Sequence, residues 1–243
     1  MSTAPLFLLD ELPPGDVIEL TGDEGRHAAR VKRLSVGEHV LVSDGRGSVA
    51  QCTVAASRPD GLELEVVERR SVPAACPRLV AVQALPKGER AELAVELLTE
   101  LGADEIVPWA ASRSIVHWLG PRGDRALDKW RRTAREATKQ SRRAWLPVVA
   151  PLASTAEVAA RLAGATGLVL HESATGPLAS ADLRDDRDVV VVIGPEGGIA
   201  PDELADFTAV GANLVRLGEP VLRTSTAGAA ALAVLSARLG RWA

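Results

Sequence analysis

The sequence predicts an α/β fold in two parts, a small all-β barrel followed by a parallel sheet with helices on both faces. Short strand-like runs broken by Gly, Pro and Asp fill residues 6–70, a pattern typical of a small all-β unit. After Pro77, apolar strands alternate with helical stretches, as they do in α/β sheets. The segment RRSVPAACPR between the two patterns holds two prolines and has the composition of a linker. We therefore expect two domains, over residues 1–72 and 73–243.

Five strand-like runs make up the expected barrel. In chain order they are LFLL, VIEL, HVLVSD, SVAQCTVAAS and LELEVVE. Between the second and the third run, the stretch TGDEGRHAARVKRLSVGE predicts a short helix. Basic side chains gather in this stretch, and they are Arg26, His27, Arg30, Lys32 and Arg33.

The second part begins with an apolar strand, LVAVQAL, followed by the helix ERAELAVELLTELG, which ends at Gly102, and by the strand EIVPWAA. Later strands are GLVLHE, VVVVIG and NLVRLG, and the stretch TAGAAALAVLSARLG predicts a closing helix. Nearly continuous apolar strands between helices are typical of a parallel sheet that is buried on both faces.

Composition limits the kinds of function. The chain has 243 residues, of which 47% are hydrophobic, and its formal net charge of -4 excludes a uniformly basic nucleic-acid binder. Cys52 and Cys76 lack metal-ligand or CxxC spacing, so we expect structural thiols, a reducing compartment and no bound metal. The N-terminal run LFLL is too short for a signal peptide, and no apolar run reaches the roughly 18 residues of a membrane span. We therefore expect a cytoplasmic protein without a membrane segment.

One stretch of the chain is locally basic. Residues 122–143, RGDRALDKWRRTAREATKQSRR, hold nine basic and three acidic residues. Leu127, Trp130, Ala134 and Ala137 recur at helical steps of three and four, so one side of a helix should dock and the rest should meet solvent. The charged side is either a solvated surface or a surface that binds phosphates, and both interpretations are open.

A glycine-rich turn follows an apolar strand in the stretch VVIGPEGGIAPDEL. Gly194, Gly197 and Gly198 permit positive φ and carry no Cβ that would hold a ligand away from the backbone. The turn comes at the carboxyl end of a parallel strand, where open α/β sheets bind their ligands. It matches neither GxGxxG nor a P-loop, so dinucleotide or triphosphate binding is unsupported. A purely structural turn is an equally good interpretation.

Two more strand ends carry polar residues. In VRLGEPVLRTSTAGAAALAVL, Arg223 looks buried between Leu222 and the hydroxyl residues that open a helix, and it could cap, form an ion pair or hold a ligand. In LVLHE, the strand ends on His171 and Glu172, which could be structural or catalytic.

Together these stretches resemble the ribosomal RNA small-subunit methyltransferase E family, which is similar to other knotted (SPOUT) methyltransferases. The resemblance covers nearly the whole chain, and VLHE, VIGPEGGIAPDEL and LGEPVLRTSTAGAAAL are its most specific motifs in combination. Two departures stand out. Ser225 occupies a position where the family has Glu in LRTETA, and KQSRR stands where EQSGR is usual.

The resemblance implies transfer of a methyl group from S-adenosylmethionine to N3 of one uridine in 16S ribosomal RNA. It also implies a C-terminal trefoil knot, a PUA-like N-terminal domain that binds RNA, and a homodimer that acts on 16S rRNA or the small ribosomal subunit. Arg223 becomes the candidate donor to the imide, and Glu172 the candidate proton acceptor with Glu196 as its alternative.

The same resemblance assigns binding residues. The cofactor would be held by Leu170, His171, Gly194, Pro195, Glu196, Gly197, Gly198, Leu217, Gly218, Leu222, Arg223 and Thr224. The RNA would be held by Arg26, His27, Arg30, Arg33, Arg131, Arg132, Arg135, Gln140, Ser141 and Arg142. Two alternatives remain, which are an inert RNA-binding protein and a knotted methyltransferase that modifies a ribose hydroxyl of transfer RNA.

Overall fold

The computed structural model describes residues 4–184 and 186–242, and the chain divides into two compact units. The first unit comprises Met1–Ala74 together with Thr138–Leu146, and the second comprises Ala75–Ala137 together with Pro147–Ala243.

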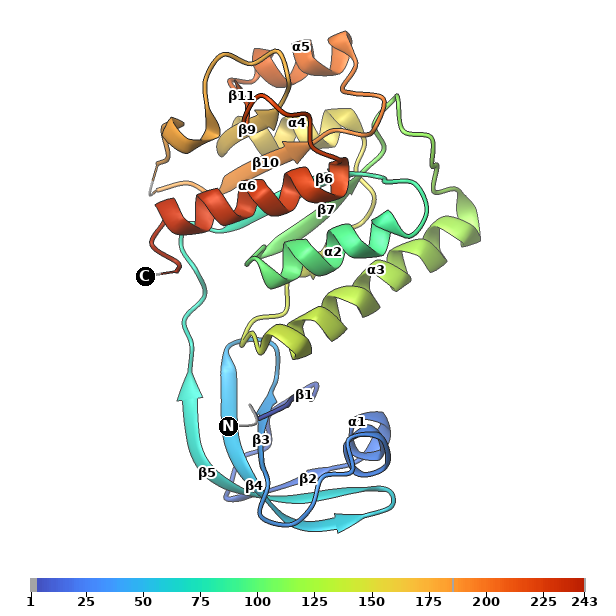
Figure 1. Cartoon of the computed structure of the whole chain (residues 1–243), viewed down its shortest axis with the longest axis vertical. Helices are drawn as coiled ribbons and strands as arrows, with labels where there is room; N and C mark the ends of the chain where they lie inside the picture. Colours follow the sequence, from blue (N-terminus) through green and yellow to red (C-terminus); the bar gives the residue numbers. More distant parts are fainter. Residues whose placement is uncertain (1–3, 185, 243) are drawn as a thin grey trace. The chain divides into compact units, whose positions relative to one another are not determined.

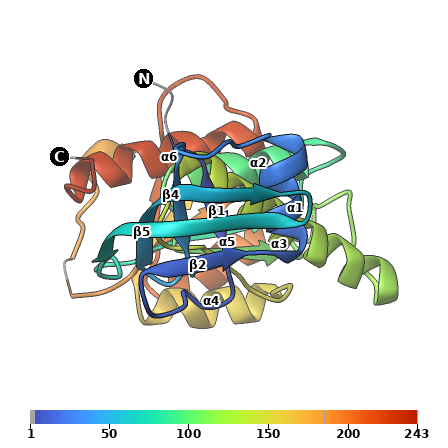
Figure 2. The ribbon, with the colours of Figure 1, turned by 90° about the horizontal axis from the view of Figure 1, so that it is seen from below.

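The first unit is built on a five-stranded sheet in the order β1-β3-β4-β5-β2. Its strands are β1 (Leu6–Leu8), β2 (Val17–Leu20), β3 (His39–Ser43), β4 (Ser48–Arg58) and β5 (Gly61–Ser71). All neighbours are antiparallel except β1 and β3, and Figure 2 shows β4, β5 and β2 side by side. The β-rich N-terminal part expected from the sequence is confirmed.

The helix expected between β2 and β3 is also present, in two short pieces. α1 (Gly22–Arg26) continues directly into a π-helical turn, η1 (His27–Val31). Ala28 of that turn is buried in the apolar core of the unit, together with Phe7, Ile18 and Leu64. The core therefore fixes which side of this basic segment faces outward.

The second unit contains a six-stranded parallel sheet in the order β11-β9-β10-β6-β7-β8. Its strands are β6 (Leu79–Ala84), β7 (Glu105–Trp109), β8 (Val148–Val149), β9 (Thr166–Leu170), β10 (Val189–Ile193) and β11 (Asn213–Val215). Every residue of β6, β7 and β10 is buried, which explains their nearly continuous apolar sequences. The predicted doubly covered parallel sheet is confirmed.

Helices cover the two faces of this sheet. They are α2 (Arg90–Glu100), α3 (Gly120–Ser141), α4 (Thr155–Ala163), the short η2 (Leu178–Ser180), α5 (Pro201–Ala209) and α6 (Thr224–Arg238), of which the last residues of α3 belong to the first unit. α2 and α6 lie together on one face, and α4 and α5 lie on the other (Figure 1). Among the described residues, no helix is both long and apolar enough to cross a membrane.

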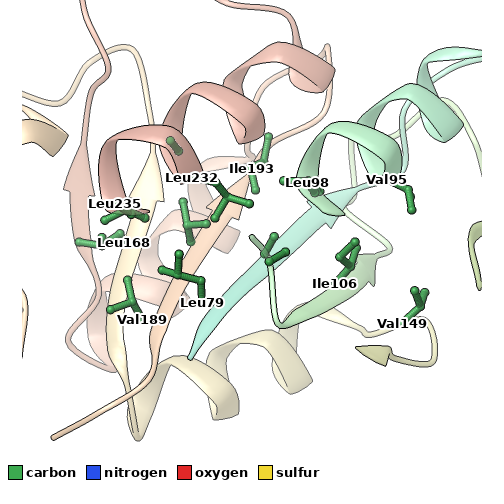
Figure 3. Close-up of a cluster of buried hydrophobic side chains, with 14 of the residues drawn as sticks. Leu79, Val95, Leu98, Ile106, Val149, Leu168, Val189, Ile193, Leu232 and Leu235 are labelled. Atoms are coloured by element: carbon green, nitrogen blue, oxygen red, sulfur yellow. The ribbon is translucent and has the colours of Figure 1, made fainter. Parts of the chain in front are cut away.

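The α2 and α6 face contains the larger core cluster. Leu98 of α2 and Leu232 and Leu235 of α6 pack over Leu79 and Val189 of the strands (Figure 3). A Cβ on Gly228 would lie 3.0 Å from Leu98 Cδ2, so the small residues of α6 serve close packing against α2 within the chain.

Ionic contacts join the amino ends of three strands. The Arg78 guanidinium lies 2.6 Å from Asp188 and 3.5 Å from Glu105, and Glu105 also pairs with Arg161 at 2.7 Å. Burial raises the pKa of the Asp188 carboxyl, but the hydrogen bonds and charge of Arg78 outweigh it and hold the pKa below its ordinary value.

Candidate functional site

A pocket of about 730 Å³ opens at the carboxyl edge of the parallel sheet in the second unit. Its walls are the segments that leave β9, β10 and β11, and in open α/β sheets this edge is where ligands bind. The structure brings together every residue that the sequence assigned to cofactor binding or catalysis. The lining includes Leu170, His171, Glu172, Gly194, Pro195, Glu196, Gly197, Gly198, Leu217, Gly218, Leu222, Arg223 and Thr224.

The three glycines of the turn after β10 have different reasons to be glycine. Gly198 has φ +72°, and nothing lies within 4 Å of the position that its Cβ would occupy. By contrast, a Cβ on Gly194 would lie 2.7 Å from Ile199 Cγ1, and a Cβ on Gly197 would lie 3.1 Å from the carbonyl oxygen of Arg113. Gly198 is thus the glycine that leaves space open, whereas the other two permit close packing within the protein.

A buried hydrogen-bonded chain ties this turn to α6. The Gln83 side-chain amide donates to Thr224 Oγ1 at 2.9 Å, and the Thr224 hydroxyl donates to the carbonyl oxygen of Gly194 at 2.7 Å. Gln83 is fully buried and Thr224 is 5% exposed. The sequence analysis did not single out Gln83, although one polar residue in a buried strand must find a partner.

Glu203, in the first turn of α5, is a second residue that the sequence analysis missed. Its carboxylate is 3% exposed and accepts hydrogen bonds from the Ser112 N–H at 2.8 Å, the Thr155 hydroxyl at 3.0 Å and the Ala200 N–H at 3.1 Å. Thr155 in turn accepts a hydrogen bond from the indole of Trp109. Glu203 therefore fastens the segment after β7 to the exit of the glycine-rich turn.

The remaining polar residues of the pocket differ in their attachment. Glu196 accepts a hydrogen bond from the Lys87 N–H at 3.3 Å, which gives its carboxylate a structural partner. His171 Nδ1 lies 2.7 Å from the Ser173 hydroxyl, while Glu172 is exposed at the pocket edge. The expectation that Arg223 is buried is wrong, because this residue precedes the first turn of α6 with its side chain exposed.

The position of Ser225 bears on the first departure from the family pattern. Ser225 is 3% exposed in the first turn of α6, next to the buried Thr224. A glutamate there would place a carboxylate beside a buried hydroxyl, whereas serine places only a second small polar group.

RNA-binding candidates in the first unit lie on the segment between β2 and β3 and at the C-terminal end of α3. Arg26 pairs with Asp23, and Arg30 Nε donates to the carbonyl oxygen of Pro59 at 2.8 Å. His27 and Ser141 are half-buried, whereas Gln140 is exposed. Arg33 and Arg142 are both exposed and both have φ +54°.

The backbone of Arg142 bears on the second departure from the family pattern. A left-handed residue directly after a helix is usually glycine, because a side chain with φ near +54° is strained. The pattern EQSGR would place glycine here, whereas this chain holds an arginine with φ +54°, for which the structure shows no compensating reason.

RNA-binding candidates in the second unit lie on α3. Trp130, Ala134 and Ala137 are buried, which confirms the predicted docking side, and Trp130 packs edge-on against Trp118 with ring centroids 5.0 Å apart. Arg131 and Arg132 are exposed, and Arg135 is half-buried. Across the described part of the chain, no group of three or more His, Cys, Asp or Glu residues is arranged to hold a metal ion.

Comparisons with known proteins agree with this architecture. Residues 74–236 match the model of an RNA methyltransferase domain, and residues 20–67 match that of an RNA methyltransferase PUA domain. The chain is 47% identical to the ribosomal RNA small subunit methyltransferase E of Mycobacterium tuberculosis, over 98% of this chain and 94% of that protein.

Solved structures extend the likeness to three dimensions. The Neisseria gonorrhoeae ribosomal RNA small subunit methyltransferase E bound to S-adenosylmethionine superimposes with a TM-score of 0.85 at 25% identity, covering 97% of this chain and 98% of that one. A methyltransferase of Legionella pneumophila, also in complex with S-adenosylmethionine, superimposes with a TM-score of 0.83 at 25% identity over 97% and 98% of the two chains.

Proposed function

The chain belongs to the ribosomal RNA small subunit methyltransferase E family, and we propose that it methylates small-subunit ribosomal RNA with S-adenosylmethionine as the methyl donor. One observation carries this proposal. The residues of the three family motifs meet around a single pocket at the carboxyl edge of the sheet. An inert RNA-binding protein would have no need of that arrangement.

The pocket fits the proposed cofactor. The open space over Gly198 admits a ligand against main-chain N–H and C=O groups, and Leu170, Leu217 and Leu222 offer apolar contact. When bound, S-adenosylmethionine supplies an electrophilic methyl group on a sulfonium. The protein then has to hold the acceptor nitrogen in line and exclude competing water.

N3 of a uridine in 16S rRNA is the proposed acceptor, on the basis of the family resemblance. Arg223 is our candidate for the donor that faces the developing imide anion, because a guanidinium stays charged and binds oxygen bidentately. Glu172 is our candidate for the proton acceptor. Glu196 is the weaker alternative, since it already accepts a hydrogen bond from Lys87.

The RNA would be held through its phosphates by both units. The supporting observations are exposed arginines between β2 and β3, directly after α3, and along α3 itself. The two matched family models lie on either side of residue 72, which supports domains over residues 1–72 and 73–243. The cytoplasm, where bacterial ribosomal RNA is made, is the location that we propose for the enzyme.

The trefoil knot and the homodimer are further parts of the proposal. The knot is supported by the strand order, because β11 lies at the edge beside β9 while the following α6 packs against α2. The homodimer rests on the family resemblance, because the small residues of α6 are used inside the chain. Light scattering in the micromolar range should give twice the chain mass of 25.5 kDa.

A transfer assay with labelled S-adenosylmethionine tests the function. Small-subunit RNA from a strain lacking the gene should accept one methyl group, and mass spectrometry should place it on N3 of a uridine. EDTA should not change the rate, because no metal is proposed. Methylation of transfer RNA instead, or saturable RNA binding without cofactor binding, would contradict the proposal in favour of one of the two alternatives.

A further inference from the structure

The segment between β7 and α3 adds a residue to the pocket that the sequence did not suggest. Arg113 lines the pocket together with the segments that follow β9, β10 and β11. Its Nη1 donates to the carbonyl oxygen of Gly197 at 3.4 Å. Its own carbonyl oxygen lies close to Gly197, because a Cβ on that glycine would be only 3.1 Å from it. The glycine-rich turn and Arg113 are therefore packed against each other.

This arginine is held in place by its neighbours. The N–H of Ser112 donates to the buried carboxylate of Glu203, and the N–H of Ser114 closes a turn on the carbonyl of Ala111. Ser114 is itself only 4% exposed. These contacts fix the backbone on both sides of Arg113, so its side chain starts from a defined position at the pocket.

The positive charge of Arg113 is not neutralised by a carboxylate among the described residues. In the described part of the chain, no ion pair joins Arg113 to a carboxylate, and its side chain is exposed. Arg223, which directly precedes α6, lines the same pocket. Arg113, Arg216 and Arg223 thus line one cavity together with the carboxylates of Glu172, Glu196 and Glu219. The guanidinium groups can donate hydrogen bonds to a ligand oxygen that becomes negative, and the carboxylates can accept a proton.

We propose that Arg113 contacts the nucleotide that receives the methyl group and donates hydrogen bonds to its base oxygen as the ring becomes negative. This inference rests on the proposed function. In that reaction, the N3 proton leaves to water or a carboxylate, the nitrogen electron pair forms the new N–C bond, and the electrons of the C–S bond stay on sulfur. The charge that passes through the ring lies on O2 and O4, and fixed donors there lower the barrier.

The carboxylate of the cofactor and the phosphates of the RNA are competing partners for Arg113, so the experiment separates the three. Arg113→Ala and Arg113→Lys are compared with Arg187→Ala, which removes an equally exposed arginine at the amino end of β10. Calorimetry gives the S-adenosylmethionine affinity, filter binding gives the RNA affinity, and single-turnover transfer at saturating cofactor and RNA gives the chemical step across neutral to alkaline pH.

For Arg113→Ala we expect an S-adenosylmethionine affinity close to wild type and a single-turnover rate lower by on the order of 10²-fold at neutral pH. The Arg113→Ala rate should recover partly at alkaline pH, where the imide ionises without a donor. The rate of Arg113→Lys should be intermediate, because lysine keeps the positive charge but cannot donate two parallel hydrogen bonds as the guanidinium does. Arg187→Ala should match wild type in all three measurements.

Three results would overturn the inference. A loss confined to S-adenosylmethionine affinity would assign Arg113 to the cofactor, and a loss confined to RNA affinity would assign it to a phosphate. An unchanged rate at neutral pH would assign it no role in transfer. If the wild-type protein itself transfers no methyl group to small-subunit RNA, the proposed function fails first, and the assay shows this separately from any effect of Arg113.

Discussion

Glu203→Gln should destabilise the second unit more than any exposed change of the same chemistry. The glutamate is 3% exposed, and one of its oxygens accepts hydrogen bonds from Ser112 and Thr155 while the other accepts from Ala200. A glutamine can keep its side-chain oxygen toward Ser112 and Thr155. Its NH₂ group then faces the Ala200 N–H, and because both groups are donors, no hydrogen bond forms between them.

The magnitude follows from these contacts. One hydrogen bond to a charged group, worth about 1.5–3 kcal/mol, is lost, and two others fall to the roughly 1 kcal/mol of a neutral bond. Relief of the buried charge offsets part of this loss. We expect a net loss of about 3 kcal/mol in the free energy of unfolding, or about 6–12 °C in Tm for a unit of this size.

Calorimetric melting measures the effect, with Glu157→Gln as the matched control. Glu157 also caps a helix of the second unit, but its side chain is exposed, so its Tm should change far less. The folded Glu203→Gln protein should also bind S-adenosylmethionine more weakly, because Ser112 and Ala200 are next in sequence to residues that line the pocket. A Tm within about 2 °C of wild type would refute the reasoning that the buried carboxylate holds these segments together.

Three further outcomes are expected. Gly198→Ala should cost about 1–2 kcal/mol of stability from its φ of +72° and should weaken S-adenosylmethionine binding, whereas Gly211→Ala, with φ +92° outside the pocket, should weaken stability alone. Arg78 lowers the folded-state pKa of Asp188, so ionised Asp188 stabilises the fold above the ordinary carboxyl pKa of about 4, and this stability is lost as pH falls through the folded-state pKa. Acid unfolding curves of wild type and Asp188→Asn should therefore differ above about pH 4 and converge at lower pH. Reversing the α3 arginines to glutamate should weaken RNA binding and reduce its salt dependence in filter binding while leaving cofactor affinity unchanged; these are Arg131, Arg132 and Arg135.

The parallel sheet could be predicted from local patterns, whereas the cofactor residues were assigned through the family resemblance and stay a prediction. Buried strands show as apolar runs, and ligand loops follow their carboxyl ends. β8 was not predicted, since the two residues Val148–Val149 are too few to show a period. The two-piece helix after β2 was expected as a helix, but nothing in its sequence indicated the π-helical turn of η1.

The missed residues act over long sequence separations. Glu203 bonds to Ser112, which is 91 residues away, and Gln83 bonds to Thr224, which is 141 residues away. In the sequence, Glu203 reads as an ordinary acidic residue in the first turn of a helix, and Arg113 reads as one exposed arginine among many. Only the polar residue inside the apolar strand LVAVQAL gave a signal, because a buried amide requires a partner.

The glycine-rich turn shows why the residue type alone does not reveal what a glycine is for. The sequence leaves two interpretations open for all three glycines, which are room for a ligand and a structural turn. The structure leaves room for a ligand at Gly198, whereas Gly194 is required by Ile199 and Gly197 by Arg113. Tight packing in a turn and close approach of a ligand both favour glycine, so the residue type alone could not separate them.

The imide proton of the proposed substrate has a free pKa about two units above neutrality, so ionising it at pH 7 costs about 3 kcal/mol. One fixed donor to an oxyanion supplies about 3–4 kcal/mol, so hydrogen bonds from Arg113 and Arg223 are sufficient to offset the free energy of ionising the imide at pH 7. The proton must still move, and Glu172 is the exposed carboxylate that we place at that step. Glu172→Gln should therefore lower single-turnover transfer by about 10²-fold or more and recover partly at high pH, whereas Glu219→Gln, which changes another exposed carboxylate of the same pocket, should not. If Glu172→Gln and Glu219→Gln both transfer the methyl group at the wild-type rate at neutral pH, Glu172 is not the proton acceptor, and the arginines and water are sufficient for the deprotonation.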